Sequence, residues 1–186
     1  AVYKGQIPFR VGIFTSFSRD HLDFHADMED YLDAKARLFH TLLAPNGVAI
    51  LNADEPACES IDTGDRDTWT YGMGPKATFR AVDLRTTVSG TRFTVITPEG
   101  SHSVLLVLKG KHNVMNALAA IAAATAIGIS AEYFIAGLEG LTKIPGRLES
   151  VENDKNITVL VDYAHTPDAL RTVLDSLRSL TRGRTP

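Results

Sequence analysis

The sequence predicts an α/β fold in which helices cover a mostly parallel β-sheet. Its N-terminal part has the order of a βαβ unit. A short strand is expected at residues 9–14, an amphipathic helix at 27–43 and, after a turn at 45–47, an apolar strand at 48–52. A continuous apolar run of this kind is typical of a parallel strand that is covered on both faces. A strand followed by a helix recurs near the C-terminus, which predicts a second α/β unit.

The middle of the chain has a different pattern and predicts a small antiparallel β meander. Three β-rich runs at residues 78–84, 91–96 and 103–108 are separated by Ser89-Gly90 and by Pro98-Glu99-Gly100. Short runs joined by glycine-containing turns form antiparallel hairpins. We expect this meander to flank the main sheet.

Two helices are expected after the meander. The first is rich in alanine, starts within residues 109–116 and ends near Gly128. The second covers residues 130–140, with Ser130 in the position of an N-cap. The segment 142–147 follows and has the proline and glycine content of a domain linker.

The last part of the chain begins a new unit. A strand at residues 157–161 ends in Asp162, and Thr166-Pro167 starts a helix with threonine as the N-cap and proline in the first turn. We therefore divide the chain into residues 1–144 and residues 145–186. One strand and one helix are too little for an independent core.

Composition excludes several classes of protein. With 186 residues, of which 44% are hydrophobic, the chain can bury a full core. The net charge of -3 provides no basic surface for nucleic acid, and no apolar run is long enough to span a membrane. Cys58 is the only cysteine, which excludes an intramolecular disulfide and favours a reducing compartment. We expect a cytoplasmic protein.

Lys35 is the most informative single residue. The helix at residues 27–43 has an apolar stripe, and Lys35 falls within it, four residues after Tyr31 and three before Leu38. A buried ammonium is costly, so a lysine in this position tends to lose its proton. A neutral amine can take up carbon dioxide, and the resulting carbamate is an anionic oxygen ligand for a hard metal. The alternative is a lysine whose side chain reaches past its neighbours to water.

Three further groups of polar residues could carry chemistry. Residues 20–25 (DHLDFH) could form a metal site or only a charged, capped turn. His112-Asn113 and Asn116, at a helix start, could cap the helix or present amides to a purine edge. Asp162, at a strand end, could bind ribose hydroxyls or only shape the turn.

Their order along the chain matches a known family. Residues 14–25 together with 31–35 (YLDAK) resemble the central ATPase domain of the Mur ligases. Residues 108–116, 145–149 (PGRLE) and 161–170 (VDYAHTPDAL) are similar to the MurE type, the UDP-N-acetylmuramoyl-L-alanyl-D-glutamate ligases. The DYAHTPDAL string is the most specific of these motifs. The resemblance covers essentially the whole sequence.

The resemblance implies a role for particular residues. Lys35 matches the lysine that is carbamylated in this family, and His21 matches a histidine that helps to hold Mg²⁺. The remaining matches lie near ATP: Asn113 and Asn116 at the adenine, Arg147 at the hinge, Asp162 at the ribose, and His165 close to the nucleotide.

The implied reaction forms an amide. In this family, ATP phosphorylates a D-glutamyl carboxylate of the UDP-linked muramoyl dipeptide, and the amine of a diamino acid, meso-diaminopimelate or L-lysine, attacks the acyl phosphate. Mg²⁺ and the carbamate oppose and orient the phosphate charge. The implied protein is monomeric.

The resemblance also implies that this sequence is a fragment. Residues 1–144 match the C-terminal part of the central domain, and residues 145–186 match the first βα unit of a Rossmann-like C-terminal domain. The sequence contains no G-x-x-x-x-G-K-[ST] phosphate loop, so these residues alone are expected to be inactive. Two alternatives stay open: another Mur-superfamily ligase, such as a folylpolyglutamate synthase, and a noncatalytic nucleotide-binding scaffold derived from one. Ser16-Phe17 and Tyr3-Lys4 depart from the usual residues of the family.

Overall fold

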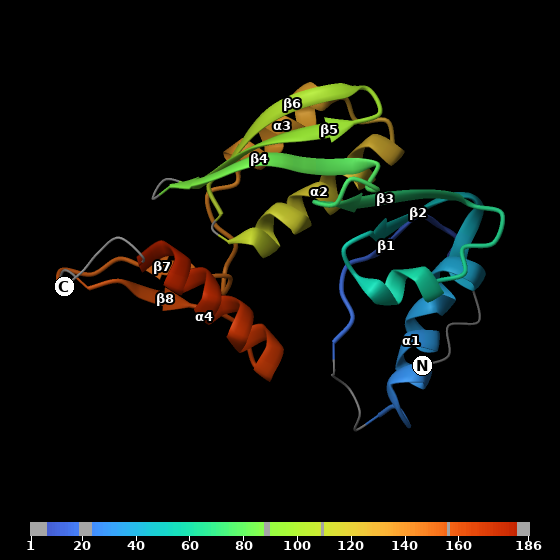
Figure 1. The fold of residues 1–186 in the computed structure, drawn as a ribbon, viewed down its shortest axis with the longest axis horizontal. Coiled ribbons are helices and arrows are strands. Elements are labelled where there is room, and N and C mark those ends of the chain that lie inside the picture. The colour runs from blue at the N-terminus through green and yellow to red at the C-terminus, as the bar shows by residue number, and fades with distance from the viewer. Residues whose placement is uncertain (1–6, 19–23, 88–89, 109, 156, 182–186) are drawn as a thin grey trace.

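The computed structural model describes residues 7–18, 24–87, 90–108, 110–155 and 157–181, and its main feature is a six-stranded sheet (Figure 1). The strands follow one another in sequence order and are β1 (Phe9–Phe14), β2 (Leu43–Asn52), β3 (Asp67–Gly72), β4 (Phe79–Thr87), β5 (Gly90–Thr97) and β6 (Gly100–Leu106). Neighbours from β1 to β4 are parallel, and those from β4 to β6 are antiparallel. This confirms the predicted α/β fold and the meander.

The meander extends the main sheet rather than standing beside it. Only Tyr71↔Phe79 and Gly72↔Arg80 pair across the β3–β4 boundary. β4 pairs with β5 from Arg80 to Thr87, and beyond Arg80 it no longer pairs with β3 (Figure 1). The sheet therefore has one continuous core face, although its two halves differ in strand direction.

The predicted helix that carries Lys35 is present, and it leads directly into the sheet. It consists of α1 (Met28–Arg37) and one π-helical turn, η1 (Leu38–Leu42). Asp27 is the N-cap, and its Oδ1 accepts the N–H of Asp30 at 2.9 Å. The chain enters β2 directly afterwards, so η1 ends where the sheet begins.

The predicted turn at residues 45–47 is wrong, because this segment lies inside β2. Phe9 pairs with Leu43, whereas Val11 pairs with Val48, so five residues of β2 pass two residues of β1. The excess forms a bulge. Gly47 is needed there, since an added Cβ would lie 2.9 Å from the Leu43 side chain.

Helices cover the sheet on both faces and create two cores. Along β2, Ile50 joins a cluster under α2 (Lys111–Ala126) and α3 (Ala131–Gly140), whereas Ala49 and Leu51 join a cluster under α1. The larger cluster includes Tyr71, Phe79, Phe93, Val95, Val104, Leu118, Ile121 and Phe134. The smaller one includes Phe14, Phe39, Leu43, Cys58 and Ile61. Among the described residues, none of the helices is both long and apolar enough to cross a lipid bilayer.

Both predicted helices after the meander are present. Gly128 follows α2 with φ +84°, a left-handed conformation that suits glycine. Ser130 occupies the N-cap position of α3, but its side chain makes no capping hydrogen bond. The predicted helix after Thr166-Pro167 is α4 (Pro167–Thr181), and Thr166 Oγ1 accepts the N–H of Ala169 at 3.2 Å.

Three elements were not predicted from the sequence. They are β3, the short 3₁₀-helix η2 (Pro56–Ser60) and β7 (Glu149–Val151). The last of these pairs antiparallel with β8 (Val159–Val161), so the C-terminal unit begins with a hairpin before α4. These strands are short or polar at one end and become evident only through their partners.

The burial of Cys58 in the smaller core predicts that its thiol reacts slowly. Its side chain is 8% exposed, and burial raises the pKa of the thiol to about 11, with the charge of Glu55 adding to the effect. At pH 8 the thiol is therefore protonated, and alkylation by iodoacetamide should be at least about a hundredfold slower than for an unfolded chain. Mass spectrometry of the native and the urea-unfolded protein measures both rates. Equal rates would show that the smaller core is not closed.

Candidate nucleotide site at the domain joint

A cavity of about 440 Å³ lies where the two parts of the chain meet. It is bounded by the residues after β1, by the first turns of α2, by the linker and by the C-terminal unit. The lining residues are Ser16, His112, Asn113, Asn116, Ile144, Arg147, Asp162, Ala164, Ala169, Thr172 and Val173. The carboxyl end of a parallel strand and the N-terminus of a helix meet here, as at ligand sites of open α/β sheets.

Four of the residues assigned to ATP from the sequence line this cavity. Asn113 and Asn116 come from α2, whereas Arg147 and Asp162 come from beyond the linker. The pair in α2 is separated from the pair beyond the linker by at least 31 residues, the interval from Asn116 to Arg147. The structure therefore brings together side chains that sequence reasoning grouped only by resemblance.

Neither asparagine occupies the N-cap position of α2. Gly110 is the N-cap residue, with φ +95°, and α2 has no side-chain capping bond. Asn113 is 4% exposed, and the Nδ2 of Asn116 lies 3.5 Å from its Oδ1. Both residues line the cavity.

His112 is a feature of the cavity to which the sequence assigned no role of its own. Burial lowers the pKa of His112, with Asp162 opposing and Arg147 supporting this effect, so the imidazole is neutral at pH 7. Its Nδ1 is buried and has no hydrogen-bond partner among the described residues. A buried polar atom without a partner is costly, which makes this nitrogen a candidate contact for a ligand.

Asp162 organises the C-terminal side of the joint. Its Oδ2 accepts the N–H of Leu148, and its Oδ1 accepts the N–H of Ala164, both at 2.8 Å. Leu148 has φ +47°, a left-handed conformation that is unfavourable for leucine and that this bond helps to maintain. Asp162 therefore does shape the turn. Each carboxylate oxygen retains a lone pair that a ligand hydroxyl could use.

Arg147 and His165 both contact Tyr163 but differ in position. The guanidinium carbon of Arg147 lies 5.8 Å from the centroid of the Tyr163 ring, and Arg147 lines the cavity. His165 donates from Nδ1 to the carbonyl oxygen of Tyr163 at 2.9 Å, and its ring meets the Tyr163 ring edge-on. His165 is exposed and is not among the lining residues.

Lys35 lies in a separate hollow next to this cavity. The hollow has a volume of about 280 Å³ and is lined by residues 13–16 at the end of β1 and by the α1–η1 helix. Ser16 lines both spaces. Lys35 is half-buried rather than enclosed, and its Nζ lies 4.8 Å from the centroid of the Tyr31 ring.

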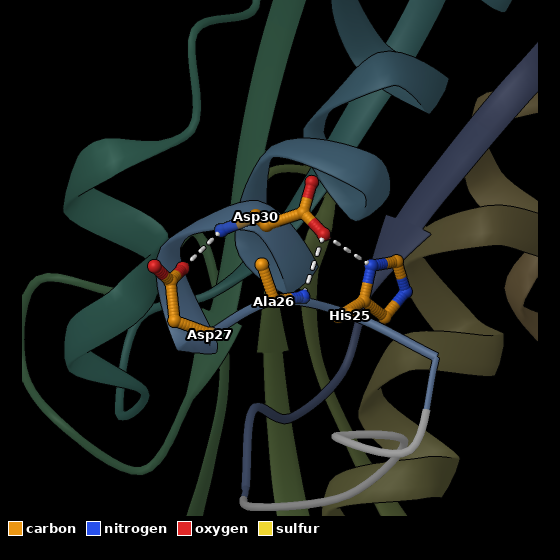
Figure 2. A network of polar contacts seen from close by, with 4 residues as sticks. All are labelled: His25, Ala26, Asp27 and Asp30. Atoms are coloured by element: carbon orange, nitrogen blue, oxygen red, sulfur yellow. Dashed lines mark hydrogen bonds and ion pairs between the residues drawn. The ribbon is translucent and has the colours of Figure 1, made fainter.

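The described residues do not form a metal site by themselves. His21 lies outside them, and among the described residues no group of three or more His, Cys, Asp or Glu side chains could hold a metal ion. Nearby His25 donates from Nδ1 to Asp30 Oδ2 at 2.9 Å, and the same oxygen accepts the N–H of Ala26 at 3.2 Å (Figure 2). An Mg²⁺ ion would thus need His21 or a modified Lys35.

Comparison with models of known protein families identifies the family of this chain. The family model for the Mur ligase middle domain matches residues 2–124, and the model for the Mur ligase glutamate ligase domain matches residues 146–185. The chain belongs to the Mur ligase family.

The relatives within the family include ligases with two different names. The chain is 44% identical over 185 residues to a UDP-N-acetylmuramoyl-L-alanyl-D-glutamate–2,6-diaminopimelate ligase of Geobacter metallireducens, covering 95% of this chain and 36% of the relative. A solved structure of a ligase of that name has a TM-score of 0.75 at 32% identity, covering 92% of this chain and 36% of the other. MurF from Acinetobacter baumannii has a TM-score of 0.82 at 26% identity, covering 91% and 37%. The chain thus spans about a third of the length of these relatives.

The two hydrogen bonds of the Asp162 carboxylate predict that a substitution there lowers stability. Asp162→Asn would place an amide nitrogen against one of the two N–H donors, so the protein should lose about 1–3 kcal/mol of stability at this joint. Thermal unfolding should show a lower midpoint. Asp154→Asn, a change of the same type at an exposed position between β7 and β8, should leave the midpoint within experimental error. Equal midpoints for all three proteins would mean that the Asp162 bonds do not stabilise the C-terminal side of the joint.

Proposed function

We propose that this chain is part of an ATP-dependent amide ligase that adds a diamino acid, meso-diaminopimelate or L-lysine, to UDP-N-acetylmuramoyl-L-alanyl-D-glutamate in peptidoglycan precursor synthesis. The observation that carries the proposal is the cavity at the joint, in which residues from both parts of the chain converge. The names of the relatives supply the reaction and the substrate class.

The cavity fits the adenosine part of ATP. The carboxamides of Asn113 and Asn116 offer donors and acceptors to a purine edge, and the neutral ring of His112 offers a nitrogen without a partner among the described residues. The carboxylate of Asp162 can accept from ribose hydroxyls, as acids at strand ends do in nucleotide-binding folds. Arg147 would oppose the phosphate charge. His165 stays a proposed nucleotide neighbour, with no support from the cavity lining.

In the proposed reaction, a D-glutamyl carboxylate oxygen bonds to the γ-phosphorus of ATP, and ADP leaves. The amine of the diamino acid then bonds to the acyl carbon and gives up a proton, while inorganic phosphate leaves. The residues of the cavity bind and orient the nucleotide, and contacts from two domains exclude water once they close on it. Their contribution is positioning and charge stabilisation rather than covalent catalysis.

Lys35 and His21 are the proposed Mg²⁺ ligands. An unmodified lysine has no lone pair for a metal while it is an ammonium. As a neutral amine, Lys35 can form an N–C bond to carbon dioxide with loss of one proton, and the carbamate oxygens suit a hard cation. The hollow beside the cavity has room for this group. When bound, Mg²⁺ would supply positive charge next to the phosphates.

The alternatives predict different substrates. A folylpolyglutamate synthase would share the general layout, and a scaffold would bind nucleotide without turnover. The similarity to diaminopimelate ligases over 95% of the chain favours the muramoyl-peptide ligase. A cytoplasmic location, a monomeric state, the absence of nucleic-acid or membrane partners and the inactivity of residues 1–186 alone remain predictions, as does the division into residues 1–144 and 145–186.

Lys35 provides the test of this function, in the full-length ligase that we propose contains this chain. The wild-type protein should release ADP only with the UDP-linked dipeptide and a diamino acid. Lys35→Arg should lower kcat as much as Lys35→Ala, by at least about a hundredfold, because a guanidinium cannot take up carbon dioxide and repels Mg²⁺. Small carboxylates should restore part of the rate to the Ala variant only.

Lys76→Arg, on an exposed turn, is the matched control and should behave like the wild type. Near-normal turnover by Lys35→Arg would mean that Lys35 only extends to solvent. Wild-type protein that releases no ADP with either diamino acid would overturn the proposed function itself.

A further inference from the structure

Asp30, His25 and Tyr31 form a continuous set of contacts that ends at Lys35. The carboxylate of Asp30 fixes the His25 ring through Nδ1 at 2.9 Å, and Asp27 fixes the backbone of Asp30 by capping α1 (Figure 2). The same Asp30 oxygen accepts the N–H of Ala26, so the carboxylate is held from two sides. The hydrogen bond with His25 lowers the pKa of Asp30, which keeps the carboxylate ionised near neutral pH.

The His25 ring in turn restrains Tyr31. Their ring centroids lie 5.1 Å apart at an interplanar angle of 29°, which is a stacked arrangement. Phe17, after β1, packs on the same tyrosine at 5.3 Å. Tyr31 is 9% exposed and His25 is 14% exposed at its side chain, so neither ring has room to turn away.

The restrained ring of Tyr31 then contacts Lys35. The two residues are one helical turn apart, and the lysine Nζ lies 4.8 Å from the ring centroid. Lys35 also lines the hollow at the end of β1, whereas Tyr31 does not. The Tyr31 ring is thus the aromatic neighbour of the Lys35 Nζ, beside the hollow that Lys35 lines.

The contacts are poorly explained by helix stability alone. Asp27 already caps α1, and the Asp30 side chain is 55% exposed, where an ion pair contributes little to stability. An aromatic ring held by a histidine–carboxylate pair is an orienting device, comparable to the outer groups that fix metal-binding side chains.

We propose that Asp30 and His25 are positioning residues that act through the ring of Tyr31 to direct Lys35 into the hollow where it is modified and used. This inference rests on the proposed function of Lys35. It predicts that damage to the contacts lowers kcat and the carbamate content together, while the Michaelis constant for ATP stays the same, because the nucleotide cavity does not include these residues.

The test uses the full-length ligase with ¹³C-labelled bicarbonate, and it reads the carbamate signal by ¹³C NMR as well as kcat and the Michaelis constant for ATP. Tyr31→Leu removes the ring and should lower kcat by at least about tenfold with loss of the carbamate signal. Tyr31→Phe keeps the ring and should retain more of both. His25→Ala and Asp30→Ala change less buried positions, so they remain informative if Tyr31→Leu does not fold.

The double variant identifies the order of the contacts. If Asp30 acts through His25, the variant with both residues changed to alanine should be no worse than His25→Ala alone. Glu29→Gln, an exposed acid in the same helical turn, is the matched control for loss of charge. Normal kcat and normal carbamate signal in folded His25→Ala and Tyr31→Leu would overturn the positioning role. A wild-type protein without a carbamate signal would overturn the modification of Lys35 and the positioning role together.

Discussion

The pair of hydrogen bonds made by the Asp162 carboxylate is the constraint on which the candidate site depends. These bonds tie the end of β8 to the backbone of Leu148, directly after the linker, and to that of Ala164 in the turn after β8. Because Leu148 has a left-handed conformation, the chain directly after the linker needs a fixed partner to keep this path. The path places Arg147 and Asp162 opposite the first turns of α2, and the cavity exists only where these two surfaces meet.

The other wall of the site depends on the main sheet. Its strands β1 and β2 contribute to the cores on both faces of the sheet. Ser16, directly after β1, borders both the nucleotide cavity and the Lys35 hollow. The helix α1 begins at a capped turn and ends in a π-helical turn that enters β2. Lys35 therefore lies on a rigid element beside the cavity, which suits a group that must be positioned relative to bound phosphates.

Local patterns predicted much of the fold, and long-range contacts account for what they missed. The stripe around Tyr31 predicted α1, and Thr166-Pro167 predicted the start of α4, because both signals lie within one or two helical turns. The bulge in β2 and the strand β7 depend on partners elsewhere in the chain, which no local pattern contains.

The site, like the fold, was predicted only in part from the sequence. Resemblance located Asn113, Asn116, Arg147 and Asp162, and the structure brings these four side chains around one cavity. Sequence reasoning assigned His112 no role of its own, because its burial, its unpartnered Nδ1 and the nearby charges of Asp162 and Arg147 are properties of the folded chain. The same holds for the contacts of His25 with Tyr31, since residues six apart can stack only when the turn before α1 folds back.

The central claim is that one nucleotide binds to both sides of the joint. Hydrogen–deuterium exchange of the full-length protein, with and without ADP, tests it most directly, because it reports on backbone amides in each part separately. A bridging nucleotide should slow exchange in two peptides at once, one covering residues 111–119 and the other residues 146–165, where the N–H groups of Leu148 and Ala164 bond to Asp162. Slower exchange on only one side of Pro145-Gly146 would contradict a site shared between the two parts.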